Sequence, residues 1–249
     1  MTDGSGVPPI SDQQRFWNEW NAAHREGAKY DAVAADPESR RRAEVVLEWL
    51  GRLRLEKPTI LDVGCGSGWL SERLAGFGVV TAVDLADEVI ARARARLPHI
   101  TFHAGDFAQL PLPPASFDVV VCLETLSALP HQAPFVEHLA RVTRPGGYLL
   151  LTVHNRFVYE RRDDVQPLAP GQVRRWMTRA EVKDLLKPHY RLMRFRTVMP
   201  AGHRGVLRIV NSYKINALLG LVLSERRIAL AKERLGFGTT MVVLARRRS

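Results

Sequence analysis

Three glycines alternate with other residues directly after a short apolar segment. Residues 60–63 read Ile-Leu-Asp-Val, Gly64, Gly66 and Gly68 follow, and a helical pattern begins at Trp69. Glycine lets the backbone turn sharply and approach a ligand closely, and the next helix offers free N–H groups at its start. Asp84 ends the following apolar segment, 20 residues after Gly64, which is the spacing at which a carboxylate reaches ribose hydroxyls. This pattern predicts a site for a nucleoside-containing ligand.

The elements that position this loop alternate between apolar runs and helical patterns. We expect strands at 59–63, 79–83, 100–103, 117–123, 147–153, 190–199 and 239–245, with a turn at 144–147 before the fifth. We expect helices at 13–24, 39–53, 69–76, 87–97, 134–142 and 178–186, and a helical stretch at 205–235. The strands are continuously apolar, which is typical of a parallel sheet covered by helices on both faces. The pattern therefore predicts a doubly wound α/β fold.

The length and the composition favour one domain. The chain has 249 residues, of which 46% are hydrophobic. We expect a flexible leader and N-terminal cap helix over 1–38, a cofactor-binding core over 39–155, and an acceptor-side lid with a basic helical insertion and the final strands over 156–249. Two cysteines exclude a disulfide framework, and no apolar run spans a bilayer, so we expect a cytoplasmic protein.

Charge is unevenly distributed along the chain. Residues 1–155 hold 15 Lys and Arg against 19 Asp and Glu, whereas residues 156–249 hold 21 against 7. A basic half attracts nucleic acid, anionic lipid or an acidic small molecule, but it also occurs as an ordinary solvated surface.

Five motifs in order resemble the class I S-adenosylmethionine-dependent methyltransferases, specifically the small-molecule branch that includes the ubiquinone- and menaquinone-biosynthesis enzymes. The resemblance covers about residues 40–190. The motifs are residues 61–68 (LDVGCGSG), 83–85 (VDL), 104–107 (AGDF), 117–124 (FDVVVCLE) and 144–150 (RPGGYLL). The resemblance implies a Rossmann-like sheet of seven strands, mostly parallel with an antiparallel last strand, and a methyl transfer without a metal.

The resemblance also implies which residues bind S-adenosylmethionine. The glycine loop would hold the methionine part, Asp84 the ribose hydroxyls, Asp106 the adenine amino group, and the backbone near Leu123 the methionine ammonium. The complete implied set is Asp62, Gly64, Cys65, Gly66, Gly68, Asp84, Leu85, Asp106, Phe107 and Leu123. Because this cofactor has no pyrophosphate, carboxylates suit it better than phosphate-binding amides. A dinucleotide oxidoreductase would instead prefer G-x-G-x-x-G, and no glycine follows Gly68 until Gly76.

A general base is needed only if the acceptor must lose a proton. Candidates are Glu124 and His131 after the fourth strand, and His154 after the fifth. Members of this family often place a histidine four residues beyond the position of Glu124, but this chain has Ala128 there. We favour His154, because it directly follows an apolar strand at the edge of the site and histidine is the side chain best suited to accepting a proton near neutral pH. The alternative is a loop histidine that only positions the substrate.

The acceptor pocket should be covered by the segments that the core fold lacks: the N-terminal helix, the 156–176 loop and the 205–235 insertion. Trp17, Trp20 and Tyr30 could stack on a planar acceptor, and Arg156 could pair with an anionic group. The tryptophans could equally hold the helix to the body. The expected acceptor is a hydroxyl or amine of an aromatic or lipophilic metabolite.

Two rival hypotheses follow from the basic half. An RNA methyltransferase is the first, but Leu123-Glu-Thr-Leu126 lacks the motif that binds base amino groups, and nucleic acid is not an expected partner. The second is a methyltransferase that docks on a membrane and acts on a quinone-like lipid. Its 205–235 insertion has an apolar centre with flanking cations, which suits an anionic bilayer surface or a homodimer interface.

Overall fold

The computed structural model describes residues 7–24 and 37–249. Within these residues a seven-stranded sheet has the order β3-β2-β1-β4-β5-β7-β6. The strands are β1 (Thr59–Val63), β2 (Val79–Asp84), β3 (Thr101–Ala104), β4 (Phe117–Leu123), β5 (Thr143–His154), β6 (Tyr190–Pro200) and β7 (Gly238–Arg247).

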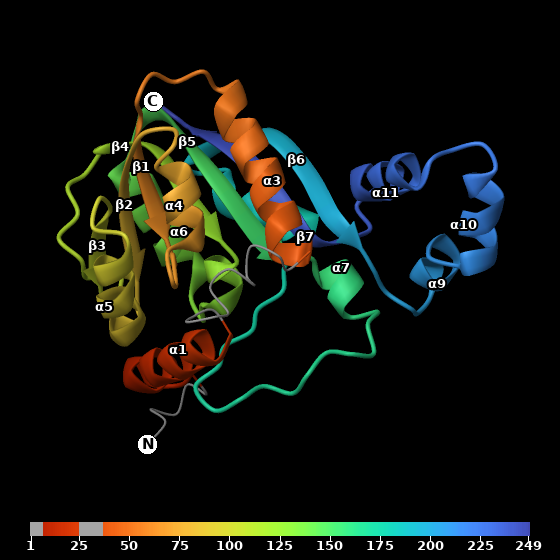
Figure 1. Cartoon of the computed structure of the whole chain (residues 1–249), viewed down its shortest axis with the longest axis horizontal. Helices are drawn as coiled ribbons and strands as arrows, with labels where there is room; N and C mark the ends of the chain where they lie inside the picture. The colour runs from red at the N-terminus through yellow and green to blue at the C-terminus, as the bar shows by residue number, and fades with distance from the viewer. Residues whose placement is uncertain (1–6, 25–36) are drawn as a thin grey trace.

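The direction of the strands confirms the predicted topology. The strand pairs β1–β2, β2–β3, β1–β4 and β4–β5 are all parallel. Strand β7 runs antiparallel to both of its neighbours, β5 and β6. The sheet is therefore mostly parallel with an antiparallel last strand, and the carboxyl ends of β1, β2, β4 and β5 meet at one edge (Figure 1).

Helices cover both faces of the sheet. They are α1 (Ile10–His24), α3 (Pro37–Arg52), α4 (Trp69–Leu74), α5 (Asp87–Arg96), the 3-10 helix η1 (Thr125–Ala128), α6 (Gln132–Val142), α7 (Arg156–Tyr159), α8 (Arg179–Leu186), α9 (Val206–Val210), α10 (Tyr213–Gly220) and α11 (Glu225–Arg234). One apolar core joins α3, α4 and α5 to one face of the sheet, and a second joins α6 and α8 to the other. Neighbouring residues of a strand alternate between the cores: Ile60 belongs to the first and Leu61 to the second. Both faces are buried, as the continuous apolar runs predict.

The predicted turn at 144–147 lies inside β5. Gly146 adopts a φ of 77°, and the β4–β5 register shifts between Phe117 and Val119. The step from Phe117 to Val119 on β4 is matched by the step from Thr143 to Tyr148 on β5, so β5 accommodates three extra residues in an extended β-bulge without ending the strand. The strand therefore begins at Thr143, four residues before its predicted start.

The predicted helical stretch at 205–235 is three short helices, α9, α10 and α11. They extend from the β6 side of the sheet, away from the end of the sheet that faces α1 (Figure 1). The 156–171 segment, predicted as a loop, contains the one-turn helix α7. The capping box predicted at Thr178 is present, because Glu181 donates its backbone N–H to the threonine hydroxyl and its carboxylate accepts the Thr178 N–H at 2.6 Å.

Candidate active site

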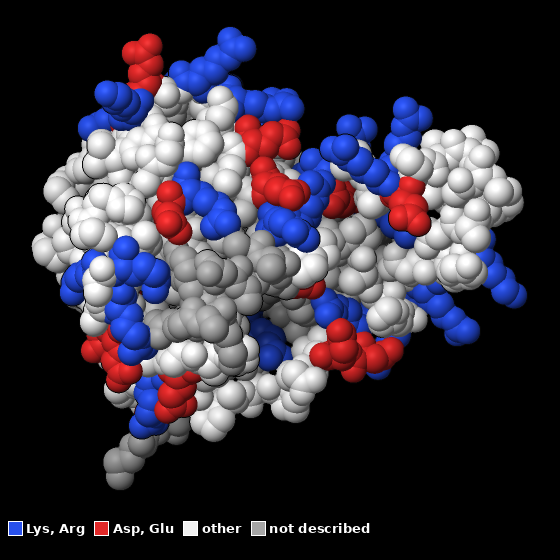
Figure 2. Space-filling model, in the orientation of Figure 1, with Lys and Arg blue, Asp and Glu red and all other residues white. Residues whose placement is uncertain are grey.

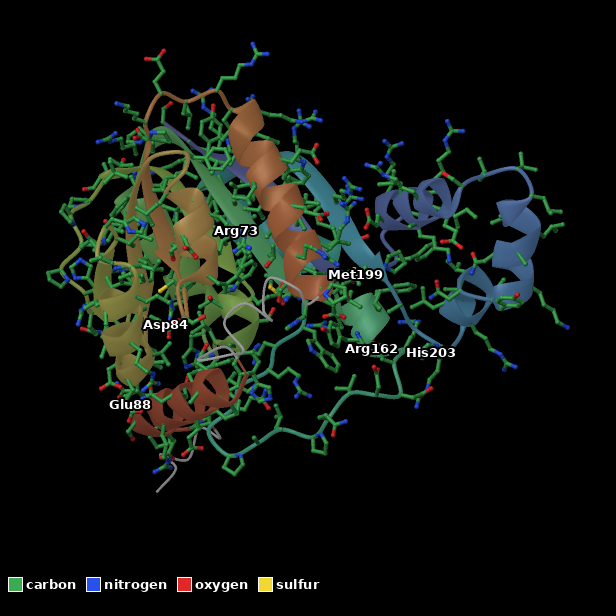
Figure 3. All side chains as sticks on the ribbon, in the orientation of Figure 1. Arg73, Asp84, Glu88, Arg162, Met199 and His203 are labelled. Atoms are coloured by element: carbon green, nitrogen blue, oxygen red, sulfur yellow. The ribbon has the colours of Figure 1, made fainter. Side chains whose placement is uncertain are left out.

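A cavity of about 420 Å³ lies at the carboxyl ends of β1, β2 and β4 and beside the end of β5. Helix α1 and residues 172–174 complete its wall. Figure 3 shows Asp84 at the end of the sheet nearest α1. In parallel α/β sheets this edge is where ligands bind, because the loops that follow the strands converge there.

The glycine loop is held by hydrogen bonds to the neighbouring strand. The backbone N–H groups of Gly64 and Cys65 both donate to the Val83 carbonyl, at 2.8 and 3.1 Å. All three glycines have a positive φ: 76° at Gly64, 52° at Gly66 and 81° at Gly68. A Cβ at Gly64 would lie 1.8 Å from the Thr125 hydroxyl. The loop therefore requires glycine at position 64 both for its conformation and for the close approach of the chain after β4.

Two carboxylates face the cavity from the ends of adjacent strands. Asp84 accepts the Gly66 N–H at 2.7 Å and the Ala86 N–H at 2.9 Å, so the backbone sets its position. Asp106 follows β3 and accepts the Ala108 N–H at 3.0 Å. Each carboxylate oxygen can accept more than one hydrogen bond, so both groups can still bind a ligand's hydroxyl or amino groups.

Asp62 on β1 holds the helix that follows the glycine loop. Its side chain is buried and accepts a hydrogen bond from the Ser71 hydroxyl at 2.6 Å, which ties α4 to β1. Burial raises the pKa of Asp62 to about 7, because the hydrogen bond from Ser71 only partly offsets the loss of hydration and Asp84 repels the charge. Burial likewise raises the pKa of the Cys65 thiol, so this cysteine is not a nucleophile at neutral pH.

Glu124 and His154 are in contact in another part of the cavity wall. The Nε2 atom of His154 lies 2.6 Å from Oε2 of Glu124. The Thr152 hydroxyl donates to Glu124 Oε1 at 2.8 Å and accepts the Glu124 backbone N–H at 3.0 Å. Glu124 has a φ of 62°, which non-glycine residues seldom adopt and which turns its side chain toward β5.

The environment of this pair keeps Glu124 ionised. Burial raises the pKa of the carboxyl, but His154, Arg42 and Thr152 together outweigh burial and lower this pKa to about 2. The Glu124 carboxylate is therefore charged at neutral pH. The Nδ1 atom of His154 is buried and has no hydrogen-bond partner among the described residues.

Two aromatic rings, those of Tyr159 and Trp176, support the His154 side chain. The Tyr159 ring meets the imidazole edge-on at 4.7 Å between centroids and stacks on Trp176 at 5.0 Å. Ser127 accepts the His154 backbone N–H at 3.0 Å. Burial raises the pKa of Tyr159, so this phenol stays neutral at neutral pH.

Most residues predicted for the site lie together around this cavity. Those that line it are Trp17, Trp20, Asp62, Gly64, Cys65, Gly66, Asp84, Leu85, Asp106, Phe107, Leu123, Glu124 and His154. The structure shows their placement, and their roles remain predictions. Gly68 lies one turn away, where it precedes α4. Tyr30 lies outside the described residues.

Three predicted contributors lie away from the cavity. His131 precedes α6 and does not line the wall. Arg156 donates to the Trp176 carbonyl and pairs with Glu181 at 3.0 Å, which holds the loop to α8 instead of facing an acceptor. The 205–235 insertion contributes no residue to the wall either, because it extends from the β6 side of the sheet. Of the three segments expected to cover the pocket, the N-terminal helix and the 156–176 loop do so.

Two arginines that were not predicted from the sequence, Arg42 and Arg174, reach the cavity. Arg42 comes from α3, is 9% exposed and lies close enough to Glu124 to lower its pKa. Arg174 comes from the 160–176 segment and donates to the Gln166 carbonyl at 2.7 Å. Both come from segments without a motif, so no local signal marks them. Within the described residues, no three His, Cys, Asp or Glu side chains lie close enough to hold a metal ion.

Comparison with known proteins gives a consistent family. Residues 61–151 match the methyltransferase domain family. The chain is 37% identical over 148 residues to the probable S-adenosylmethionine-dependent methyltransferase of Mycolicibacterium smegmatis, covering 59% of this chain and 56% of that protein. It is 38% identical over 110 residues to the ubiquinone biosynthesis O-methyltransferase of Hydrogenovibrio crunogenus, covering 41% and 45%. The chain thus spans about half the length of the curated relatives it matches.

Solved structures show the same fold at lower identity. The S-adenosylmethionine-dependent methyltransferase from Mesorhizobium loti superposes with a TM-score of 0.58 at 22% identity, covering 82% of this chain and 98% of that one. A similarity at this identity supports the architecture alone.

Proposed function

The chain carries a class I S-adenosylmethionine-dependent methyltransferase domain, and we propose that it transfers the methyl group of that cofactor to a hydroxyl or amine of a small aromatic or lipophilic acceptor. The observation that carries this proposal is that one cavity joins the glycine loop and its two carboxylates to the Glu124–His154 pair.

The hydrogen-bonding groups of the cavity fit the cofactor. Asp84 and Asp106 would accept hydrogen bonds from ribose hydroxyls and an adenine amino group, and the loop backbone at 64–66, which also lines the cavity, would hold the methionine part. When bound, the cofactor would supply a methyl group on a sulfonium, from which a neutral thioether departs readily. The ionised carboxylate of Glu124 also keeps this part of the cavity favourable for positive charge.

The Glu124–His154 pair is the proposed proton acceptor. Glu124 lies against one nitrogen of the imidazole, and the buried Nδ1 lacks a partner among the described residues. A buried nitrogen without a partner indicates a ligand group that completes it. Nδ1 is covered in this structure, so we propose that the His154 side chain turns toward the cavity when the acceptor binds. The imidazole would then take the acceptor's proton while the acceptor bonds the methyl carbon and the carbon–sulfur bond breaks, with the neutral thioether as the leaving group.

The walls of the cavity favour a small acceptor over a polynucleotide. Apolar and aromatic side chains from several segments line it: Trp17 and Trp20 on α1, Val173 in the loop between α7 and α8, and Leu129 and Phe135 near α6. These side chains offer apolar and aromatic surface, whereas RNA binding uses an open basic surface with stacking positions. Arg174 is a second cation in the wall besides Arg42, and we propose it as the partner of a carboxylate or phosphate on the acceptor.

Calorimetric titration with S-adenosylmethionine and with S-adenosylhomocysteine tests the cofactor. We expect one site per chain for each compound, and Asp84→Asn should weaken binding at least about tenfold, because it loses the charge that accepts the ribose hydroxyls. Asp184→Asn, an exposed carboxylate on α8, is the matched control and should bind normally. A folded protein that binds neither compound would overturn the proposal.

The acceptor class is tested by the formation of S-adenosylhomocysteine with catechols, phenols that carry an alkyl tail, aromatic amines and tRNA. Turnover with one of the small acceptors supports the proposal. Methylation of tRNA alone would transfer the assignment to the RNA alternative.

A further inference from the structure

The 205–235 segment, here called the arm, carries apolar side chains that the rest of the chain does not cover. Its helix α10 has no buried residue. Tyr213 is 86% exposed, Leu221 80% and Val222 83%, with Leu218 at 67%. Residues 215–223 contain no charged residue. Several large apolar side chains exposed within one short segment of a folded protein mark an interaction site.

The base of the arm is held firmly to the sheet. Glu233 on α11 is 3% exposed, and it accepts hydrogen bonds from Arg41 at 2.9 Å and from Arg196 at 3.1 Å. Its backbone carbonyl accepts the Thr197 hydroxyl at 2.6 Å. Lys232 donates to Asn211 at 3.2 Å, which ties the start of the arm to its end. The exposed apolar residues therefore belong to a segment that is fixed to the sheet at its base. The arm does not have to change its position before it binds a partner.

Cations surround the apolar part of the arm. The segment from 205 to 235 holds Arg208, Lys214, Arg226, Arg227, Lys232 and Arg234 against two glutamates, one of which is the buried Glu233. Figure 2 shows the uncharged end of the arm with Lys and Arg around it. Apolar side chains at a tip with cations behind them match a surface that is negatively charged outside and apolar beneath.

We propose that the arm docks on an anionic lipid bilayer, with Tyr213, Leu218, Leu221 and Val222 entering the interface and the surrounding Lys and Arg side chains meeting the headgroups. The charges distinguish this partner from a second copy of the chain. Two arms face to face would bring their cations together, whereas anionic lipid attracts them. A role as a lid is not supported, because no arm residue lines the cavity.

The structure limits the mode of contact. No helix among the described residues is long and apolar enough to cross a membrane. Docking is therefore peripheral, and it depends on both the apolar side chains and the charges. Because neither the cofactor nor the acceptor takes part in it, this inference stands independently of the proposed methyl transfer.

Co-sedimentation with vesicles tests the proposal. The full chain is mixed with vesicles of equal parts phosphatidylcholine and phosphatidylglycerol, and with vesicles of phosphatidylcholine alone. We expect binding to the anionic vesicles, at least tenfold weaker binding to the neutral ones, and a strong decrease as NaCl rises from 50 to about 500 mM.

Two variants separate the apolar from the electrostatic contribution. Leu221→Ser with Val222→Ser should reduce the partition coefficient about tenfold or more, whereas Val79→Ser with Leu168→Ser, exposed at 66% and 55% elsewhere, should leave it unchanged. Arg226→Glu with Arg227→Glu should reduce binding to the anionic vesicles, and the same exchange at the exposed Arg191 and Arg194 should have a smaller effect. Thermal unfolding checks that all variants fold.

Several results would overturn the inference. The first is equal partition into both vesicle types, and the second is no partition at 50 mM NaCl. The third is a mass in light scattering that doubles with concentration and is restored to one chain by the Leu221/Val222 variant, which would assign the arm to a homodimer. A failure of the cofactor titration would leave the docking result intact, so the two proposals are tested separately.

Discussion

Asp84 ends β2 and Glu124 follows β4 at the same edge of the sheet, but they are held in different ways. The two oxygens of Asp84 accept backbone N–H groups of Gly66 and Ala86, one in the glycine loop and one just after β2. Glu124 instead contacts the side chains of Thr152 and His154, which both belong to β5. The side of the cavity proposed to bind the cofactor, here called the cofactor side, is thus organised by backbone, and the opposite side by side chains of β5 that meet Glu124.

This difference predicts which substitutions should disturb each side of the cavity. Backbone groups are present whatever the side chain, so the cofactor side depends on conformations that only glycine adopts and on the carboxylates themselves. The opposite side depends on which side chains meet, so it can be altered without disturbing the loop. The following predictions test this separation.

Gly64→Ala should have the largest effect, because it changes the backbone-organised side. A Cβ would lie 1.8 Å from the Thr125 hydroxyl at a φ of 76°. We expect the free energy of unfolding to fall by about 3 kcal/mol or more, measured by urea denaturation. Gly220→Ala, where a Cβ meets no atom within 4 Å, should change stability by less than about 1 kcal/mol. Equal stability of both variants would show that the loop does not need this glycine.

His154→Ala should separate the two sides most clearly. Turnover should fall about 10²-fold or more because the proton acceptor is lost, while the Kd for the cofactor should stay within a few-fold. His131→Ala, which removes the histidine that does not line the cavity, should leave turnover unchanged. Unaltered turnover in the His154 variant would reject its role, and a large loss of cofactor affinity would show that the two sides are not independent.

The pH dependence of stability should report the charge of Glu124. Its pKa of about 2 in the folded chain lies below its ordinary value, so the ionised form stabilises the fold. This contribution is complete above about pH 5 and is lost as the pH falls toward 2. We expect Glu124→Gln to be less stable than the natural chain by about 1 to 3 kcal/mol at pH 7, with the difference decreasing by pH 3. A difference that is constant with pH would show that the pair does not set the charge.

Trp20→Ala should have the smallest effect. This residue lines the cavity from α1, so we expect the acceptor KM to rise about three- to tenfold while cofactor affinity stays within twofold. Phe16→Ala on the same helix, which does not line the cavity, is the control. A lower melting temperature with an unchanged KM would instead show that Trp20 holds α1 to the body.

The sequence by itself determined the sheet, its parallel core and the position of the glycine loop beside Asp84. Apolar periodicity placed the strands, and the spacing from Gly64 to Asp84 placed loop and carboxylate together, because both follow from local backbone rules along one βαβ unit. The strand ends were less well predicted where a bulge replaced a turn, as at Gly146, since a register shift depends on the neighbouring strand.

Only the tertiary structure decided how the remaining residues meet. The sequence analysis named Glu124 and His154 as separate candidate bases, whereas the structure joins them and adds Thr152 and Arg42. The same holds for the 205–235 segment, whose pattern suited a lid, a dimer or a membrane contact until the fold placed it away from the cavity. Side chains from distant elements are brought together by packing across the whole sheet, and spacing along the chain carries no record of that packing.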